Sequence, residues 1–255
     1  MKIGPETPAL VSGGASGLGE ACARALRAAG APVALLDRDT DRGSTVVAEI
    51  GAMLVATDVT SDASVTDALA AAAAAHGPAR IVINCAGIAP AMKVAGSKGA
   101  HDMALFEQVI AVNLVGTMRV MAHAASTMRG LDPLDDDGCR GAIVNTASIA
   151  AFEGQMGQAA YAASKGGVAA LTLPAARDLA RDGIRIAAIA PGIFATPMLR
   201  GLPEDVQASL AEQVPFPVRL GDPAEFARLA LFIIETGYMN GEVVRLDGAL
   251  RMGAR

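Results

Sequence analysis

A serine, a tyrosine and a lysine have types and spacings that suit proton transfer. Tyr161 and Lys165 stand four residues apart, and Ser148 precedes the tyrosine by thirteen positions. Helical residues at i and i+4 project from the same face, so these two side chains can interact. A phenol has a pKa near 10, and a neighbouring ammonium, together with the positive charge of a bound cofactor, favours the phenolate and lowers that pKa. The serine hydroxyl can hydrogen-bond a substrate oxygen and help to hold developing charge.

An accidental tyrosine–lysine pair on one helix face is the competing interpretation. The chain contains only two tyrosines and four lysines, so neither residue type is a common choice here. The small-residue run AASKGG permits close approach to the pair, and a glycine-rich loop lies upstream. We therefore predict that Ser148, Tyr161 and Lys165 are catalytic.

The upstream loop, SGGASGLG, joins an expected first strand to an expected first helix. Glycines let the backbone turn sharply and approach a pyrophosphate at the helix N-terminus. The spacing is Gly-x-x-x-Gly-x-Gly, unlike the commoner Gly-x-Gly-x-x-Gly, and it points to a particular family of dinucleotide-binding proteins. An ordinary glycine-rich turn is the alternative for this loop taken alone. Its candidate cofactor-binding residues are Ser12, Gly13, Ser16, Gly17, Leu18 and Gly19.

An aspartate at the end of the expected second strand predicts which dinucleotide binds. Asp37 follows Gly19 by 18 residues. A carboxylate there can accept the hydrogen bonds of an adenosine ribose diol and repel a 2′-phosphate, which favours NAD over NADP. The adjacent Arg38 can hold a 2′-phosphate, so some use of NADP stays open. Later strand ends should meet adenine and ribose, although each could be a simple turn; these candidates are Asp58, Val59, Asn84, Ala86 and Gly87.

Short apolar runs alternate with helical stretches along the chain. This pattern predicts a single α/β domain over residues 1–255, a Rossmann-type doubly wound parallel sheet with helices on both faces. The expected strands are Ala9–Ser12, Pro32–Asp37, Met53–Thr57, Arg80–Asn84, Ala142–Thr146, Arg185–Ala190 and Glu242–Leu246. The expected helices are Leu18–Ala29, Ser61–His76, Met103–Arg129, Tyr161–Arg181 and Pro223–Glu235.

Three irregular segments interrupt the alternation. Ala89–Asp102 and Gly130–Gly141 are expected to be loops, and the aspartate run in the second is interpreted as solvated because adjacent aspartates cannot all reach one ion. The third, Gly192–Pro217, follows a strand at the edge where ligands of open α/β sheets bind. We therefore expect residues 192–217 to form a substrate loop, and we expect no metal site.

Composition and charge exclude several classes of protein. A net charge of −5 gives no support to nucleic-acid binding. Three cysteines without a Cys-x-x-Cys pair argue against a disulfide scaffold or a zinc site and favour a reducing compartment; Cys22 and Cys85 are expected to be inert core residues. No apolar run of about 20 residues and no signal-peptide core is evident, so we expect a cytoplasmic protein without a membrane span.

From about Ala9 to Met252 the sequence resembles the short-chain dehydrogenase/reductase family. Its motifs occur in order: Gly13–Gly19, NCAG at Asn84–Gly87, VN at Val112-Asn113, Ser148, YAASK at Tyr161–Lys165, and PG at Pro191-Gly192. The resemblance implies NAD-dependent interconversion of a secondary alcohol and a ketone. It also implies that Asn113 completes a catalytic tetrad by bending its helix around a relay water, and that Lys165 binds the nicotinamide ribose. Pro191, Gly192 and Thr196 would join the cofactor site; Ser12 replaces the family's usual threonine.

Four segments resemble one subgroup of that family, the type 2 3-hydroxyacyl-CoA dehydrogenases, also described as 17β-hydroxysteroid dehydrogenases. The segments are NTASIAAFEGQMGQAAYAASKGG, ARDLARDGIR, QVPFPVRLGDPAEFA and NGEVVRLDGALRM. The resemblance implies NAD, an acyl-CoA substrate, a homotetramer, and substrate contacts from Gln155 and Gln158. Vertebrate members are mitochondrial, but no Arg-rich, Ser-rich transit segment is evident. A hydroxysteroid or another small secondary alcohol is the alternative substrate, and a non-catalytic NAD-binding sensor is a remote alternative.

Overall fold

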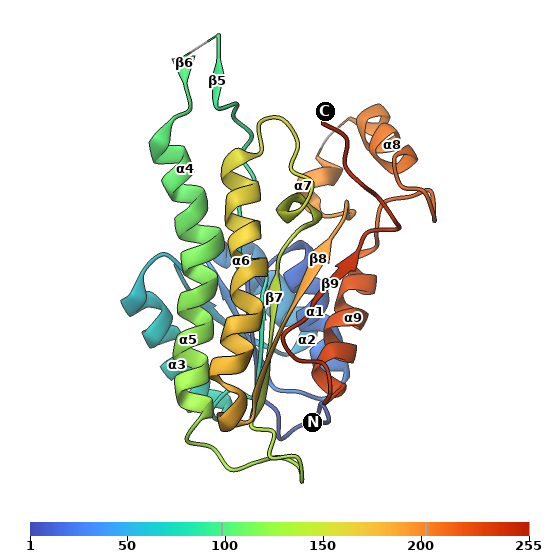
Figure 1. Cartoon of the computed structure of the whole chain (residues 1–255). Coiled ribbons are helices and arrows are strands. Elements are labelled where there is room, and N and C mark those ends of the chain that lie inside the picture. Colours follow the sequence, from blue (N-terminus) through green and yellow to red (C-terminus); the bar gives the residue numbers. More distant parts are fainter. Residues whose placement is uncertain (98, 202, 255) are drawn as a thin grey trace.

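Seven parallel strands form the centre of the molecule (Figure 1). The computed structural model describes residues 1–97, 99–201 and 203–254. Along the sheet the order is β3-β2-β1-β4-β7-β8-β9, so the chain winds outwards from β1 and then outwards again from β4 in the opposite direction. Ligands of such sheets bind where the order reverses. The strands are β1 Ala9–Ser12, β2 Val33–Asp37, β3 Met53–Ala56, β4 Ile81–Asn84, β7 Gly141–Thr146, β8 Ile184–Pro191 and β9 Val243–Leu246.

The strands confirm the predicted α/β fold, and their ends lie within one residue of the predicted ends. β4, with the sequence IVIN, is buried throughout. Ile81 and Ile83 face one layer of helices and Val82 faces the other, because successive residues of a strand point to opposite faces. Strands covered by helices on both faces are apolar at successive positions. Such continuous apolar runs allowed the strands to be predicted from the sequence.

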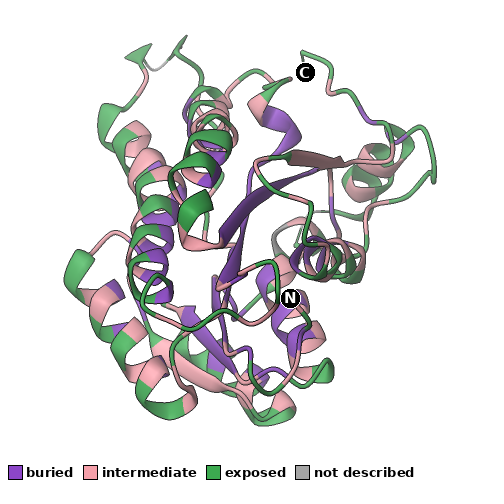
Figure 2. Cartoon of the chain, turned by 60° about the horizontal axis from the view of Figure 1, so that its bottom comes forward, coloured by how far each residue is buried: buried purple, intermediate pink, exposed green. Residues whose placement is uncertain are grey.

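Two layers of helices cover the sheet. One layer supplies Leu26, Phe226 and Ile233 to the core, and the other supplies Met121 and Met128. Figure 2 shows the buried strands between helices whose outer faces are exposed. The first layer comprises α1 Gly17–Ala28, α2 Thr40–Ile50 and α9 Pro223–Glu235; the second comprises α3 Asp62–His76, α4 Met103–Ile110, α5 Thr117–Met128 and α6 Ala159–Asp178.

Helix α2 was not among the helices expected from the sequence. Its residues TDRGSTVVAEI include a glycine and several β-branched side chains, which have low helix propensity. Packing explains the helix, since a Cβ on Gly43 would lie 2.7 Å from the Leu54 Cδ1 atom of β3. Gly43 therefore lets α2 lie close to the sheet. The Asp39 side chain also accepts a hydrogen bond from the Arg42 amide, which caps the helix.

Two of the three segments expected to be irregular contain regular structure. The substrate loop over 192–217 contains α7 Pro197–Arg200 and α8 Glu204–Glu212. Pro197 suits the first turn of a helix, and Glu204 and Asp205 favour the N-terminus of α8. Ala89–Asp102 contains a small antiparallel hairpin, β5 Ala95–Gly96 and β6 Gly99–Ala100. Short 3-10 turns occupy Ile149–Ala151 (η2) and Ala180–Asp182 (η3).

A π-helical turn, η1 Ala111–Gly116, joins α4 to α5 without a break. The resulting helix, Met103–Met128, is long and apolar enough to cross a membrane by length and composition alone, which is weak evidence. Figure 1 shows it beside α6, as part of one helical layer. Val120, Met121 and Ala124 pack into the core shared with the sheet. The expectation that no segment spans a membrane stays a prediction.

Candidate active site

A pocket of about 640 Å³ lies at the carboxyl ends of the strands. The glycine loop, the ends of several strands, α6 and the segment after β8 all contribute to its wall. Most of the predicted site residues therefore come together, although they are far apart in the sequence. Those that line it are Gly13, Ser16, Gly17, Leu18, Gly19, Asp37, Asp58, Val59, Ala86, Gly87, Ser148, Gln155, Gln158, Tyr161, Lys165, Pro191, Gly192 and Thr196.

Close backbone packing shapes the glycine loop. A Cβ on Gly19 would lie 2.1 Å from the Gly13 carbonyl oxygen, and a Cβ on Gly13 would lie 2.6 Å from the Ala86 nitrogen. Gly17 has a φ of +56° and lies under Thr196, whose Cγ2 would be 3.3 Å from an added Cβ. Helix α1 begins at Gly17, so its N-terminus faces the pocket. These glycines let the loop pack tightly against the segment after β4 at the N-terminus of α1, and the residues present fit a bound dinucleotide.

Asp37 lies beside this loop at the end of β2. Its Oδ2 atom accepts a 2.9 Å hydrogen bond from the Ala15 amide, and its Oδ1 atom accepts a 3.0 Å bond from the Asp39 amide. The carboxylate is thus held in place within the pocket wall next to Arg38. Asp58 is likewise held by Thr60, whose hydroxyl and amide hydrogen bonds lower the pKa of the Asp58 carboxyl.

Ser12 and Asn84 do not line the pocket; they lie beneath it. The Ser12 hydroxyl donates a 3.0 Å hydrogen bond to the Asn84 side-chain oxygen, and the Asn84 amide donates a 2.9 Å bond to Asn145. The Ala86 amide in turn donates to the Ser12 hydroxyl oxygen at 3.4 Å. Both side chains point into the core and hold the ends of β1, β4 and β7 together. The sequence placed them at strand ends but carried no signal of which way they point.

Ser148, Tyr161 and Lys165 lie together in the pocket. Burial raises the pKa of the Tyr161 phenol, and hydrogen bonding with Ser148 lowers it by less. Lys165 donates a 2.7 Å hydrogen bond to the Thr146 carbonyl, and its Nζ lies 5.9 Å from the centroid of the Tyr161 ring. Burial lowers the pKa of Lys165 to about 8. Burial is therefore the larger effect on the Tyr161 pKa in the protein alone, whereas the expected lowering included the positive charge of a bound nicotinamide.

Asn113 lies in the π-helical turn and links two parts of the site. Its side-chain oxygen accepts a 2.8 Å hydrogen bond from the Ile88 amide, and its side-chain nitrogen donates to the Ile88 carbonyl and to the Ser164 hydroxyl. Ser164 directly precedes Lys165. A Cβ on Gly87 would contact both the Asn113 Oδ1 atom, at 3.3 Å, and the Lys165 Nζ atom, at 3.6 Å. Asn113 thus ties the loop after β4 to the lysine-bearing helix.

Several residues of the pocket were not singled out from the sequence. Met252 comes from the C-terminal tail, Leu210 from α8 and Gln108 from α4. Leu210 lies in a segment expected to be irregular, and Met252 marks the end of the family resemblance without an expected role in the site. Gln158 lines the pocket as predicted, but its side-chain oxygen accepts a hydrogen bond from the Gln155 amide. The glutamines therefore stabilise each other's segment.

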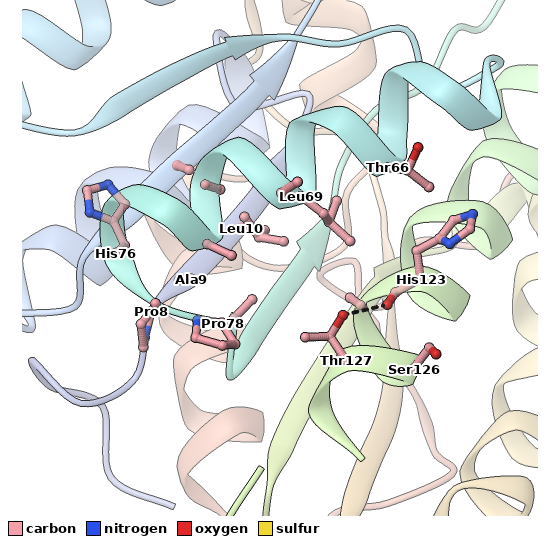
Figure 3. Close-up of a pocket in the computed structure, with 17 residues that line it drawn as sticks. Pro8, Ala9, Leu10, Thr66, Leu69, His76, Pro78, His123, Ser126 and Thr127 are labelled. Carbon is pink, nitrogen blue, oxygen red and sulfur yellow. Dashed lines mark hydrogen bonds between the residues drawn. The ribbon is translucent and has the colours of Figure 1, made fainter. Parts of the chain in front are cut away.

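A second pocket, of about 300 Å³, lies at the opposite end of the sheet between α3 and α5 (Figure 3). Alanines of α3 line much of it, because such short side chains leave the space between the helices unfilled. His76 and His123 lie at opposite sides of the pocket in Figure 3. The serine, tyrosine and lysine described above all line the larger pocket, so the chemistry belongs there. Among the described residues, no group of three His, Cys, Asp or Glu side chains is placed to hold a metal.

Fold and pocket together define a class, the dinucleotide-dependent oxidoreductases that move a proton through a tyrosine. A model of the short chain dehydrogenase family matches residues 7–207 of this sequence. The chain belongs to that family and is a dehydrogenase that acts on a CH–OH group.

Individual relatives extend over nearly the whole chain. Bovine 3-hydroxyacyl-CoA dehydrogenase type-2 is 52% identical and aligns with 96% of this chain and 95% of its own length. The crystal structure of a 3-hydroxyacyl-CoA dehydrogenase type-2 from Mycobacterium avium is 43% identical, covers both chains completely and has a TM-score of 0.94. A cis-4-hydroxycyclohexanecarboxylate dehydrogenase from Sinomonas cyclohexanicum is 36% identical over 95% of this chain and 96% of its own length.

Proposed function

We propose that this dehydrogenase interconverts 3-hydroxyacyl-CoA and 3-oxoacyl-CoA with NAD. The observation that carries the chemistry is the Ser148–Tyr161–Lys165 cluster, which lies in one pocket with the glycine loop and Asp37. The acyl-CoA substrate is supported by the full-length similarity to the bovine and mycobacterial proteins. Ile149, Leu199 and Met252 add apolar surface to the same pocket, which suits a short acyl chain.

In this mechanism the protein's own residues handle the proton. When bound, the nicotinamide accepts or supplies the hydride. Tyr161 takes the hydroxyl proton during oxidation and returns it during reduction. Ser148 holds the substrate oxygen and orients the phenol through their hydrogen bond. Lys165 binds the nicotinamide ribose and supplies positive charge beside Tyr161, and Asn113 holds the lysine-bearing helix in place.

The direct test is the oxidation of NADH with acetoacetyl-CoA, set beside a panel of steroid ketones and cyclic ketones. Turnover of acetoacetyl-CoA with a kcat/KM at least about tenfold above that of the other ketones supports the proposal. The Sinomonas relative favours a small cyclic alcohol as the second candidate substrate. Turnover only with steroids or cyclic ketones would move the substrate to that alternative. NADH binding without turnover on any carbonyl would favour a non-catalytic sensor.

The preference for NAD gives a prediction at Asp37. Its carboxylate is held by two backbone amides in the pocket wall, where it would repel a 2′-phosphate. Replacing Asp37 by alanine is expected to raise the NADPH-to-NADH ratio of kcat/KM by at least about tenfold, a change of ~1.4 kcal/mol. Asp41→Asn, at an exposed position on α2, serves as the control. An unchanged ratio in Asp37→Ala would remove the role assigned to this carboxylate.

A homotetramer and a cytoplasmic location are further parts of this proposal. Several large apolar side chains are exposed on the helices. They are Val115 and Met118 on the long helix Met103–Met128, Leu173 on α6 and Phe232 on α9. Burial of such surfaces against other copies would stabilise an oligomer. Sedimentation at micromolar concentration should give four times the chain mass, and a monomer would contradict it. The three free cysteines suit a reducing compartment, which cell fractionation can test.

A further inference from the structure

Two cysteines expected to be inert lie in contact at the floor of the cofactor pocket. Cys85 follows β4 and lines the pocket. Cys22, one turn after Gly19 on α1, is completely buried. The Cys85 Cβ lies 3.2 Å from the position of a Cβ on Gly19, so Cys22 and Cys85 lie on facing surfaces of α1 and the segment after β4. Both belong to the same packed cluster beneath the glycine loop. Cys85 is therefore only partly buried at the pocket wall, whereas the sequence had placed it in the core.

The surroundings make the two thiols unequal. Thr146 donates a 3.4 Å hydrogen bond from its hydroxyl to the Cys85 sulfur, and the Lys165 ammonium lies close enough to favour a negative charge there. The hydrogen bond from Cys22 lowers the pKa of Cys85 most, with further lowering from Thr146 and Lys165. The same hydrogen bond and burial raise the pKa of Cys22. Thr146 and Lys165 thus favour Cys85 as the attacking sulfur, and Cys22 lies behind it as the second thiol.

We propose that Cys85 and Cys22 form a peroxide-sensitive modification site that closes to a disulfide when the cofactor pocket is empty. The Cys85 thiolate attacks one oxygen of hydrogen peroxide, the O–O bond breaks, and the second oxygen leaves as water after taking a proton. The Cys22 sulfur then attacks the sulfenic acid of Cys85. An S–S bond forms, the S–O bond breaks, and the oxygen leaves as a second water with the Cys22 proton. Two electrons pass from the two thiols to the peroxide.

Closure of this bond should weaken dinucleotide binding. The Cys85 carbonyl carbon lies 2.8 Å from the position of a Cβ on Gly13, and the Cys85 Cβ lies 3.2 Å from that of a Cβ on Gly19. The glycine loop is therefore packed tightly against Cys85, so a movement of Cys85 would displace the loop. A disulfide would withdraw the Cys85 sulfur from Thr146, whose carbonyl holds Lys165. A bound dinucleotide, conversely, would cover Cys85 and slow its oxidation; this protection rests on the proposed cofactor site, whereas the disulfide itself does not.

The experiment treats the reduced protein with hydrogen peroxide and follows the free thiols and the non-reduced peptide map. Two of the three thiols should be lost, the joined peptides should contain Cys22 and Cys85, and dithiothreitol should restore both. Saturating NADH should slow the loss of the two thiols at least about tenfold, because Cys85 would react with peroxide only when no NADH is bound. Oxidised protein should bind NADH at least about tenfold more weakly, a shift of ~1.4 kcal/mol.

Two variants make the test specific. Cys139→Ser removes a buried thiol that lies in another part of the fold and should leave the reaction unchanged. Cys22→Ser should stop disulfide formation and leave a sulfenic acid on Cys85 that dimedone traps. Three surviving thiols, a disulfide between separate chains, or oxidation at Cys139 would overturn the proposal. If fluorescence shows that the protein binds NADH, yet both thiols are lost at the same rate with and without NADH, the proposal that oxidation requires an empty cofactor pocket would be overturned. Failure to bind NADH at all would instead contradict the proposed function.

Discussion

Tyr161→Phe is expected to lower kcat for carbonyl reduction by about 10²–10⁴-fold while NADH still binds, because the substitution removes only the hydroxyl that carries the proton. Tyr161 shares a hydrogen bond with Ser148 and is placed beside Lys165. The aromatic ring stays, so the packing of α6 should be preserved. Stopped-flow or steady-state NADH oxidation measures the loss, and fluorescence titration measures NADH binding.

The chain offers a matched control for this variant. Tyr238, the other tyrosine, is fully exposed between α9 and β9. Tyr238→Phe makes the same chemical change at a site outside the pocket and should leave kcat unchanged. Turnover by Tyr161→Phe at the wild-type rate would contradict the assignment of Tyr161 as the proton donor and acceptor.

The burial of the Tyr161 phenol also predicts how the two directions depend on pH. Burial raises its pKa, so the neutral phenol predominates at neutral pH in the protein alone. The phenol is the form that donates a proton during reduction, and the phenolate is the form that accepts one during oxidation. The rate of alcohol oxidation should therefore rise with pH through the alkaline range, while reduction should fall over the same range.

Lys165→Met is expected to remove activity and to stabilise the fold. Lys165 is buried and has a pKa lowered to about 8 by desolvation. The ordinary pKa of a lysine is near 10.4. Lowering the Lys165 pKa from that value reduces the free energy of unfolding at neutral pH by roughly 3 kcal/mol at most. Methionine has a similar shape and no charge, although the Thr146 carbonyl loses its donor, at about 1 kcal/mol. The free energy of unfolding should rise by on the order of 1–2 kcal/mol at pH 7, and kcat should fall at least about 10²-fold.

The pH dependence separates this effect from a change in packing. An unfolded lysine binds a proton more tightly than buried Lys165, so wild-type stability should rise as pH increases from about 8 towards 10. The advantage of Lys165→Met should shrink over that range. Lys93→Met, at an exposed position, is the control and should show neither effect. Denaturant melts at several pH values measure both, and a Lys165→Met protein less stable than wild type at pH 7 would contradict the argument.

Much of the fold and site followed from local patterns in the sequence. The apolar runs of the buried strands predicted the sheet, and the spacing of Tyr161 and Lys165 placed both on one helical face. The direction in which a side chain points was harder to predict from the sequence, because it depends on contacts between distant segments. Asn84 turns into the core towards Ser12 and Asn145, whereas Cys85, the next residue, turns to the pocket. No pattern within β4 distinguishes these two outcomes.

Elements stabilised mainly by tertiary contacts were likewise missed. Helix α2 depends on the fit of Gly43 against Leu54, and that contact is not visible in a run of polar and β-branched residues. The direction of the Tyr161 pKa in the protein alone was also not visible in the sequence, because spacing reveals a neighbouring lysine but not how deeply both groups are buried.

The π-helical turn at Ala111–Gly116 constrains the length of this part of the chain. Each residue of an α-helix turns the following segment by about 100° about its axis. Val120 and Met121 must meet the core while Asn113 must meet Ile88 and Ser164. Adding or removing one residue within the turn would rotate α5 relative to α4 and break one of these two sets of contacts. Over evolution the segment should therefore keep its length, because an insertion or a deletion would break one set of contacts whatever the residue added or lost.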